Sequence, residues 1–205
     1  MSRYHDDRTA ADLPGRLPLS ESKLRIFHPE LFGWRAWLTV TWWNGVVFNS
    51  SATIELIAEH LVFGDSNPAI VVSIAPELII GAYSDDLDAI VLLRFDPTWV
   101  ERLHLVVGMR VLTINTYMRG SRVSPDVEEG ARSARRWVNV YPLIAETLCD
   151  DSLLVQKRKA EIDAELWGRA EDLVAEMTRR DRVHLRDGSP LGARKRGILS
   201  PFPRG

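Results

Sequence analysis

The sequence has a single cysteine, Cys149, among its 205 residues. One cysteine excludes an internal disulfide and any metal site built on two thiolates, and it is typical of proteins kept in a reducing compartment. No uninterrupted apolar run approaches the ~18 residues that a membrane-spanning helix needs. Residues 1–18 also lack the apolar core of a secretory signal. We therefore expect a soluble, cytoplasmic protein with no membrane partner.

The chain has almost no excess of charge of either sign. It carries 26 Lys and Arg against 28 Asp and Glu, a formal net charge of −2. This balance argues against a general binder of nucleic acid or membrane surfaces. The local exception is Arg194-Lys195-Arg196 near the C-terminus. This basic triplet either contacts nucleic acid or an acidic partner, or is simply a solvated end.

Complete catalytic signatures are missing as well. Gly108, Gly120 and Gly130 are isolated, so no glycine-rich phosphate loop is present, and Ser50 and Ser51 lie in no Gly-x-Ser-x-Gly turn. The five histidines are scattered, with no two at a metal-ligand spacing. Any catalytic role must therefore come from another group of side chains.

What the chain does have is a strong pair of central strands. Leu78–Tyr83 and Ala89–Phe95 are continuous apolar runs without a helical polar face, which is typical of strands buried on both faces. Between them lies Ser84-Asp85-Asp86-Leu87-Asp88, and Ser and Asp favour turns because their side chains can bond to nearby backbone groups. This stretch predicts a hairpin at the centre of the sheet.

The remaining pattern predicts one domain over residues 23–185, strand-rich over 37–117 and helical over 131–185. We expect residues 1–22 to be a disordered leader and residues 186–205 a disordered basic tail. Segregated strands and helices indicate an α+β fold, with a mainly antiparallel sheet, helices on one face and a long C-terminal helix.

Individual elements follow from turn residues and periodicity. The expected elements, in chain order, are a hairpin over 37–49 turning at Asn44-Gly45, a helix over 54–62 stopped by Gly64, a turn over 65–68, a strand over 69–75, a helical turn over 99–103, one strand over 105–117 or two strands broken at Gly108, a short helix before Asn139, a helix over 142–148 and the long helix over 153–180.

The acidic turn is the first candidate site. Asp86 and Asp88 are two residues apart, so in strand geometry both side chains leave the same face, and Asp85 lies beside them. Paired carboxylates can hold Mg²⁺ or Mn²⁺, which prefer oxygen ligands. The competing interpretation is that these residues only form the turn and oppose edge-to-edge pairing.

Two local resemblances concern the same turn. Ser84 to Asp88, followed by an apolar strand, resembles the Asp-x-Asp strand of the nucleotidyltransferase superfamily, although the Gly-Ser turn of that family is not found about ten residues upstream. Tyr83-Ser84-Asp85-Asp86 resembles the Tyr-x-Asp-Asp hairpin of reverse transcriptases. Each resemblance covers under a dozen residues and implies metal-dependent phosphoryl or nucleotidyl transfer. In such an enzyme, Arg94 or Arg110 would contact phosphate if the fold brings them close to the turn.

Aromatic residues make a second candidate site. Trp34, Trp42 and Trp43 belong to a cluster that either stacks on a ligand or peptide at the surface, or forms part of the core.

Three functional hypotheses remain open. The first is a non-catalytic protein-interaction module that binds another protein or a second copy of itself. The second is a divalent-metal enzyme, or a relic of one, in which Asp86 and Asp88 hold the metal and Asp85 assists them or orients water. The third is a protein that neutralises a partner by covering a basic site with the acidic turn.

Overall fold

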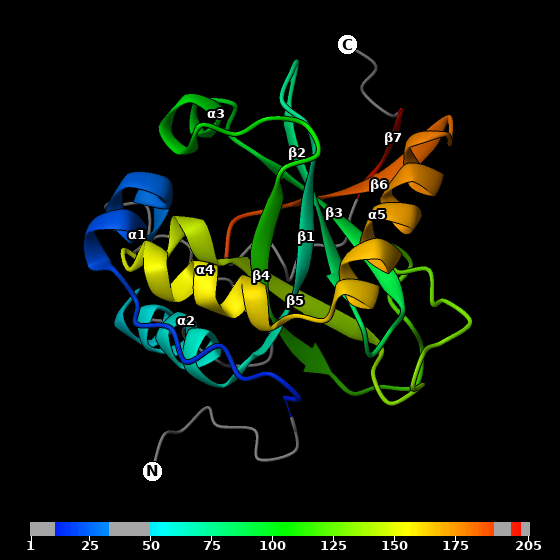
Figure 1. Cartoon of the computed structure of the whole chain (residues 1–205), viewed down its shortest axis with the longest axis horizontal. Helices are drawn as coiled ribbons and strands as arrows, with labels where there is room; N and C mark the ends of the chain where they lie inside the picture. Colours follow the sequence, from blue (N-terminus) through cyan, green and yellow to red (C-terminus); the bar gives the residue numbers. More distant parts are fainter. Residues whose placement is uncertain (1–10, 33–49, 191–197, 202–205) are drawn as a thin grey trace.

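The computed structural model describes residues 11–32, 50–190 and 198–201. Its strands form one sheet, and its helices pack around that sheet (Figure 1). The helical elements are α1 (Glu21–Phe27), η1 (Pro29–Leu31), α2 (Ser50–Phe63), α3 (Thr98–Leu103), η3 (Ala145–Thr147), α4 (Ser152–Glu161) and α5 (Ala164–Thr178). The strands are β1 (Asp65–Ser73), β2 (Leu78–Ser84), β3 (Ala89–Phe95), β4 (Arg110–Met118), β5 (Asn139–Ile144), β6 (Arg182–Asp187) and β7 (Ile198–Pro201).

The strands form a single sheet in the order β5-β4-β1-β2-β3-β6-β7. Every neighbouring pair is antiparallel except β3 and β6, which are parallel. The α+β fold with a mainly antiparallel sheet is therefore confirmed. So is the central hairpin, because β2 and β3 pair from Leu78–Phe95 to Ser84–Ala89.

The sheet is curled, and Arg186 joins two strands that are not neighbours in it. Its Nη1 donates to Val140 O of β5 at 2.7 Å, and its Nη2 donates to Asn139 Oδ1 at 3.0 Å. Arg186 belongs to β6 and is only 1% exposed. Its Nε also donates to Asp126 Oδ2 at 2.8 Å, so three N–H groups are bonded inside the protein, as burial of a guanidinium requires.

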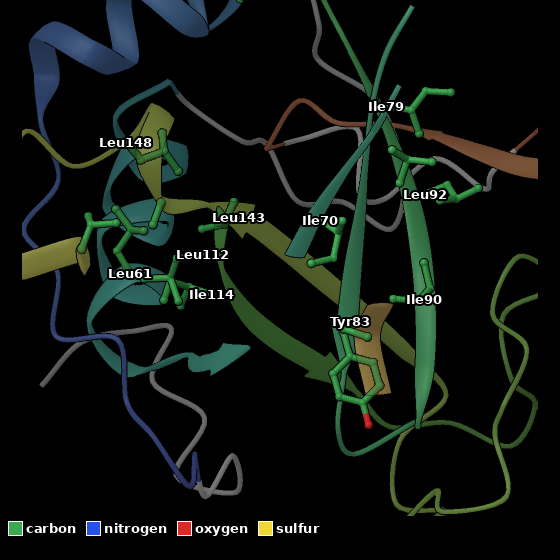
Figure 2. Close-up of a cluster of buried hydrophobic side chains, with 14 of the residues drawn as sticks. Leu61, Ile70, Ile79, Tyr83, Ile90, Leu92, Leu112, Ile114, Leu143 and Leu148 are labelled. Carbon is green, nitrogen blue, oxygen red and sulfur yellow. The ribbon is translucent and has the colours of Figure 1, made fainter. Parts of the chain in front are cut away.

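Alternation along the strands separates two apolar clusters. Ile79 and Tyr83 of β2 belong to the first cluster, which Figure 2 shows with residues of β1, β3, β4 and β5. Helices α2, α4 and α5 pack on this side through Ile57, Val155 and Trp167.

The second cluster takes the alternate residues of the same strands, such as Leu78 and Ile80 of β2. Phe27 of α1 and Trp99 of α3 also belong to it. The expectation that all helices cover one face is therefore not confirmed, because helices contribute to both clusters.

The C-terminal helix is divided, so the long helix expected over 153–180 is not confirmed either. Ile162 adopts an extended backbone with φ −71° and ψ 131°, and its side chain is buried. Asp163 then begins α5, since its side chain accepts from Glu165 N at 2.8 Å. An Asp at this position is a strong helix start, and it separates α4 from α5.

The prediction of two helices around Pro142 is wrong. Residues Asn139–Ile144 form strand β5 at the edge of the sheet, and only the short η3 follows. Proline is tolerated in an edge strand because its missing N–H can face away from the ladder.

The predicted turn over residues 65–68 is also wrong. Asp65 to Pro68 begin β1 and pair with β4, from Asn115 to Leu112. Pairing between β1 and β2 starts only at Ala69, so Pro68 removes no hydrogen bond from that ladder.

Parts of both chain ends that were expected to be disordered belong to the fold. In the leader, Leu17 is fully buried and its N–H donates to Leu61 O at 3.1 Å, while Gly15 N donates to Gly64 O at 2.9 Å. In the tail, Arg186 and Asp187 complete β6, and β7 pairs beside it. The hairpin expected over 37–49 lies outside the described residues.

Candidate functional site: the acidic turn and the loop it holds

The acidic turn, Ser84–Asp88, is built by its own side chains. Ser84 Oγ accepts from Leu87 N at 3.2 Å, and Asp85 Oδ1 accepts from Asp86 N at 2.8 Å. Asp88 has a positive φ of 47°, which Asp tolerates better than most residues. The turn-forming chemistry inferred from the sequence is thus present, and it sets the direction of each carboxylate.

Asp88 points towards α5. Arg169 binds it with two hydrogen bonds, Nε to Oδ1 and Nη2 to Oδ2, both 2.8 Å long. Arg132 N donates to Oδ2 at 3.1 Å, and Tyr83 OH donates to Oδ1 at 3.3 Å. The Arg169 hydrogen bonds, then those from Arg132 and Tyr83, lower the pKa of Asp88 although it is 1% exposed. A buried carboxylate with four donors is a structural anion.

Asp86 points towards the long connection between β4 and β5, residues 119–138, which we call the 119–138 loop. Arg136 Nη2 donates to Asp86 Oδ1 at 2.5 Å, and Trp137 Nε1 donates to Oδ2 at 3.0 Å. The main-chain oxygen of Asp86 accepts from Ala134 N at 2.9 Å. Asp86 therefore binds the loop through its side chain and its backbone.

The loop approaches the turn closely at one more point. Gly130 N donates to Leu87 O at 3.0 Å. A Cβ atom added to Gly130 would collide with the main-chain oxygen of Asp88 and with its carboxylate. Glycine is therefore required here for the loop to lie against the turn.

Asp85 faces neither α5 nor the 119–138 loop. It lies near Asp65, at a polar end of the sheet. Tyr117 OH donates to Asp85 Oδ1 at 3.1 Å, and Asp85 N donates to Asn67 Oδ1 at 3.2 Å. Burial, with the neighbouring Asp86 charge, raises the pKa of Asp85 above its usual range.

Asp65, which sequence reasoning missed, is the most perturbed carboxyl of this end. Burial and the Asp85 charge raise its pKa to about 7, although Leu13 N donates to Oδ1 at 2.8 Å and Asn67 Nδ2 to Oδ2 at 3.0 Å. Two like charges in a poorly solvated region favour the protonated form of one of them. No sequence signal separates this residue from an ordinary turn aspartate.

The structure thus directs Asp85, Asp86 and Asp88 to three different sets of partners. Among the described residues, no group of three or more His, Cys, Asp or Glu side chains is placed to hold a metal ion. Arg94 and Arg110 pair with Glu77 and Glu171, and Arg94 lies at the end of the β2–β3 hairpin away from the turn. The Mg²⁺ or Mn²⁺ hypothesis stays a prediction.

The 119–138 loop carries functional candidates that sequence reasoning passed over as a polar connection. It contains five exposed arginines: Arg119, Arg122, Arg132, Arg135 and Arg136. The sequence signal that could have identified the loop is its five arginines within 18 residues of a nearly neutral chain.

The two ends of the loop lie side by side. Ser124 N donates to Val138 O at 2.7 Å, and Val138 N donates to Met118 O at 2.9 Å. The Trp137 ring stacks on Tyr117 with centroids 5.4 Å apart, and the Arg119 guanidinium lies 5.2 Å from the Trp137 ring centre. Trp137 is only 4% exposed, so this stack belongs to the interior.

The other predicted binding residues, Trp34, Trp42, Trp43 and the triplet Arg194-Lys195-Arg196, lie outside the described residues. Within the described part of the chain, none of the helices has the length and apolar character to span a membrane. No family model matches the chain, and comparison with curated proteins and with solved structures gives no significant match.

Proposed function

We propose that this protein is a non-catalytic interaction module whose binding surface is the 119–138 loop. The observation that carries the proposal is the attachment of the loop to the acidic turn. Six donors of the loop, from Gly130, Arg132, Ser133, Ala134, Arg136 and Trp137, reach oxygens of Asp86, Leu87 and Asp88. Two of the three carboxylates that suggested a metal site, Asp86 and Asp88, accept hydrogen bonds from the loop.

A connection of this length without regular structure is commonly a functional segment or a disordered one. Here the backbone is held by hydrogen bonds and by Gly130, while five arginine side chains remain exposed on it. A surface presented by a rigid scaffold loses less conformational entropy when a partner binds. This combination fits recognition better than a structural connection alone.

The test blocks the loop sterically. Ser121 is exposed on the loop and Lys157 is exposed on α4, while Cys149 is fully buried. Polyethylene glycol attached to Ser121→Cys should abolish capture of a stoichiometric partner from a lysate of the source cells, and the same polymer on Lys157→Cys should not. The partner must then bind the unmodified protein as a purified pair in sedimentation velocity.

Equal capture by both modified proteins would contradict the loop assignment. Self-association of the unmodified chain, lost with the polymer on residue 121, would identify the partner as a second copy.

A cytoplasmic location fits the buried, unpaired Cys149.

The second candidate function is a divalent-metal phosphoryl- or nucleotidyl-transfer enzyme, and one observation favours it. Asp65 and Asp85 are like-charged and poorly solvated neighbours, and the pKa of Asp65 reaches about 7. A cation at this end of the sheet would relieve their repulsion. Against it stand the ion pairs of Asp86 and Asp88 with Arg136 and Arg169.

A further inference from the structure

The arginines of the 119–138 loop differ in whether the protein neutralises them. Arg132 pairs with Glu165 at 2.8 Å, and Arg136 pairs with Asp86 at 2.5 Å. Arg119, Arg122 and Arg135 form no ion pair with any residue that the structure describes. Three exposed positive charges are therefore available to a partner.

These three arginines come from two segments that the fold brings together. Arg119 and Arg122 lie in the first segment and Arg135 in the second, and the hydrogen bonds of Val138 and Ser124 hold the segments side by side. Arg119 is further oriented by its position over the Trp137 ring. The backbone next to Arg135 is fixed as well, since Ala134 N donates to Asp86 O.

Guanidinium groups recognise carboxylates and phosphates through paired, planar hydrogen bonds. One observation favours carboxylates on a protein over a nucleic acid. Trp137, the aromatic residue of the loop, is buried against Tyr117, so residues 119–138 present no exposed ring on which bases could stack.

We propose that Arg119, Arg122 and Arg135 bind an acidic surface of a partner protein. This inference rests on the proposed function and adds the chemistry of the partner to it. The acidic turn then serves this binding in two ways. Its residues hold the loop in place, and Asp86 neutralises Arg136 while Arg119, Arg122 and Arg135 remain exposed and charged.

The probe is a fluorescein-labelled decaglutamate peptide, followed by anisotropy in low salt. The variant is Arg119→Ala/Arg122→Ala/Arg135→Ala. Its matched control is Arg25→Ala/Arg94→Ala/Arg102→Ala, three exposed arginines of α1, β3 and α3. Both triple variants change the formal net charge from −2 to −5, since each removes three positive charges.

We expect the wild type and the control variant to bind the peptide with dissociation constants within about twofold of each other. The loop variant should bind about tenfold more weakly, as expected for three exposed charge pairs. Binding should weaken as salt is added, since such charges are screened.

Three outcomes would overturn the inference: equal weakening in both triple variants, tighter binding of a ten-nucleotide oligothymidylate than of the peptide, or no peptide binding by the wild type. If one of them occurs while the polymer on residue 121 still blocks partner capture, the loop remains the binding surface and only the acidic chemistry is wrong.

Discussion

Arg186 of β6 and Asp126 of the 119–138 loop form an ion pair in the interior, with Nη2 and Oδ2 2.7 Å apart and side chains 1% and 2% exposed. The two residues are separated by 60 positions in the chain. Because Arg186 also binds Val140 O, this pair connects β5, β6 and the loop. The loop is thus anchored in the interior of the curled sheet as well as on the acidic turn.

Removing Asp126 should destabilise the fold strongly. Asp126→Ala leaves the Arg186 charge buried without its carboxylate, which typically costs about 3–5 kcal/mol of the free energy of unfolding. Urea denaturation measures this loss. The control is Glu77→Ala, which breaks an exposed pair with Arg94 and should cost at most about 1 kcal/mol. Similar losses in the two variants would show that the buried pair is not an anchor.

Stability should depend on pH through Asp65. Its pKa is raised to about 7 in the folded protein, so between pH 4 and pH 7 the folded state binds more protons than the unfolded state. The free energy of unfolding should therefore fall as pH rises through this window, by up to about 4 kcal/mol. Asp65→Asn, which cannot titrate, should have a flatter profile. Parallel profiles in urea denaturation at pH 4.5 to 8 would contradict this assignment.

Asp88 should act in the opposite direction at lower pH. Its pKa is lowered by Arg169, so its stabilisation is complete above the pKa of about 3.9 in the unfolded chain and is lost as pH falls through the lower pKa of the folded state. An Asp88→Asn variant should lose stability at pH 7, and its difference from the wild type should shrink below pH 4.

Two glycine substitutions should have effects of opposite sign. Gly130→Ala places a methyl group against the Asp88 backbone, so it should destabilise the protein by 1 kcal/mol or more and increase tryptic cleavage at Arg132 and Arg135. Gly168 lies in α5, and a Cβ there meets no atom within 4 Å. Gly168→Ala should stabilise the protein by about 0.5–1 kcal/mol. Faster cleavage in both variants would contradict the specific role of Gly130.

Divalent cations should have little effect on thermal unfolding. A metal on the acidic turn would have to displace Arg169 from Asp88 and Arg136 from Asp86. Millimolar MnCl₂ or MgCl₂ is therefore expected to leave Tm unchanged. A ligand at about 100 times its Kd adds about 2.7 kcal/mol of stability, so a bound metal would be seen readily. A rise in Tm that Asp85→Ala removes would support the enzyme hypothesis instead.

The predictable parts of this fold are those fixed by local pattern. The β2–β3 hairpin follows from two apolar runs around a Ser/Asp turn, and α2 follows from helical spacing ended by Gly64. Strand β5 was predicted as helical because Pro142 is favoured at a helix start and disfavoured inside a strand, whereas its place at the sheet edge, known only from the fold, removes the conflict.

The site is harder to predict than the fold because its partners are distant in sequence. The chemistry of the acidic turn was visible, but Asp88 meets Arg169 across 81 positions and Asp86 meets Trp137 across 51. Arg186 illustrates the same limit, since an arginine in a polar, glycine-rich end looks solvated until its buried acceptors are known. Which charges are neutralised, and which remain available, is a property of tertiary contacts.

The most direct test of the account is amide hydrogen exchange of the 119–138 loop in Asp86→Ala, with Asp172→Ala as control. Asp172 is an exposed carboxylate on α5, whereas Asp86 receives Arg136 and Trp137 of the loop. We predict faster exchange in Asp86→Ala across residues 119–138, with the β2–β3 strands unchanged, and no change in the control. Unchanged exchange of the loop in Asp86→Ala would contradict the claim that the acidic turn holds the binding surface in place.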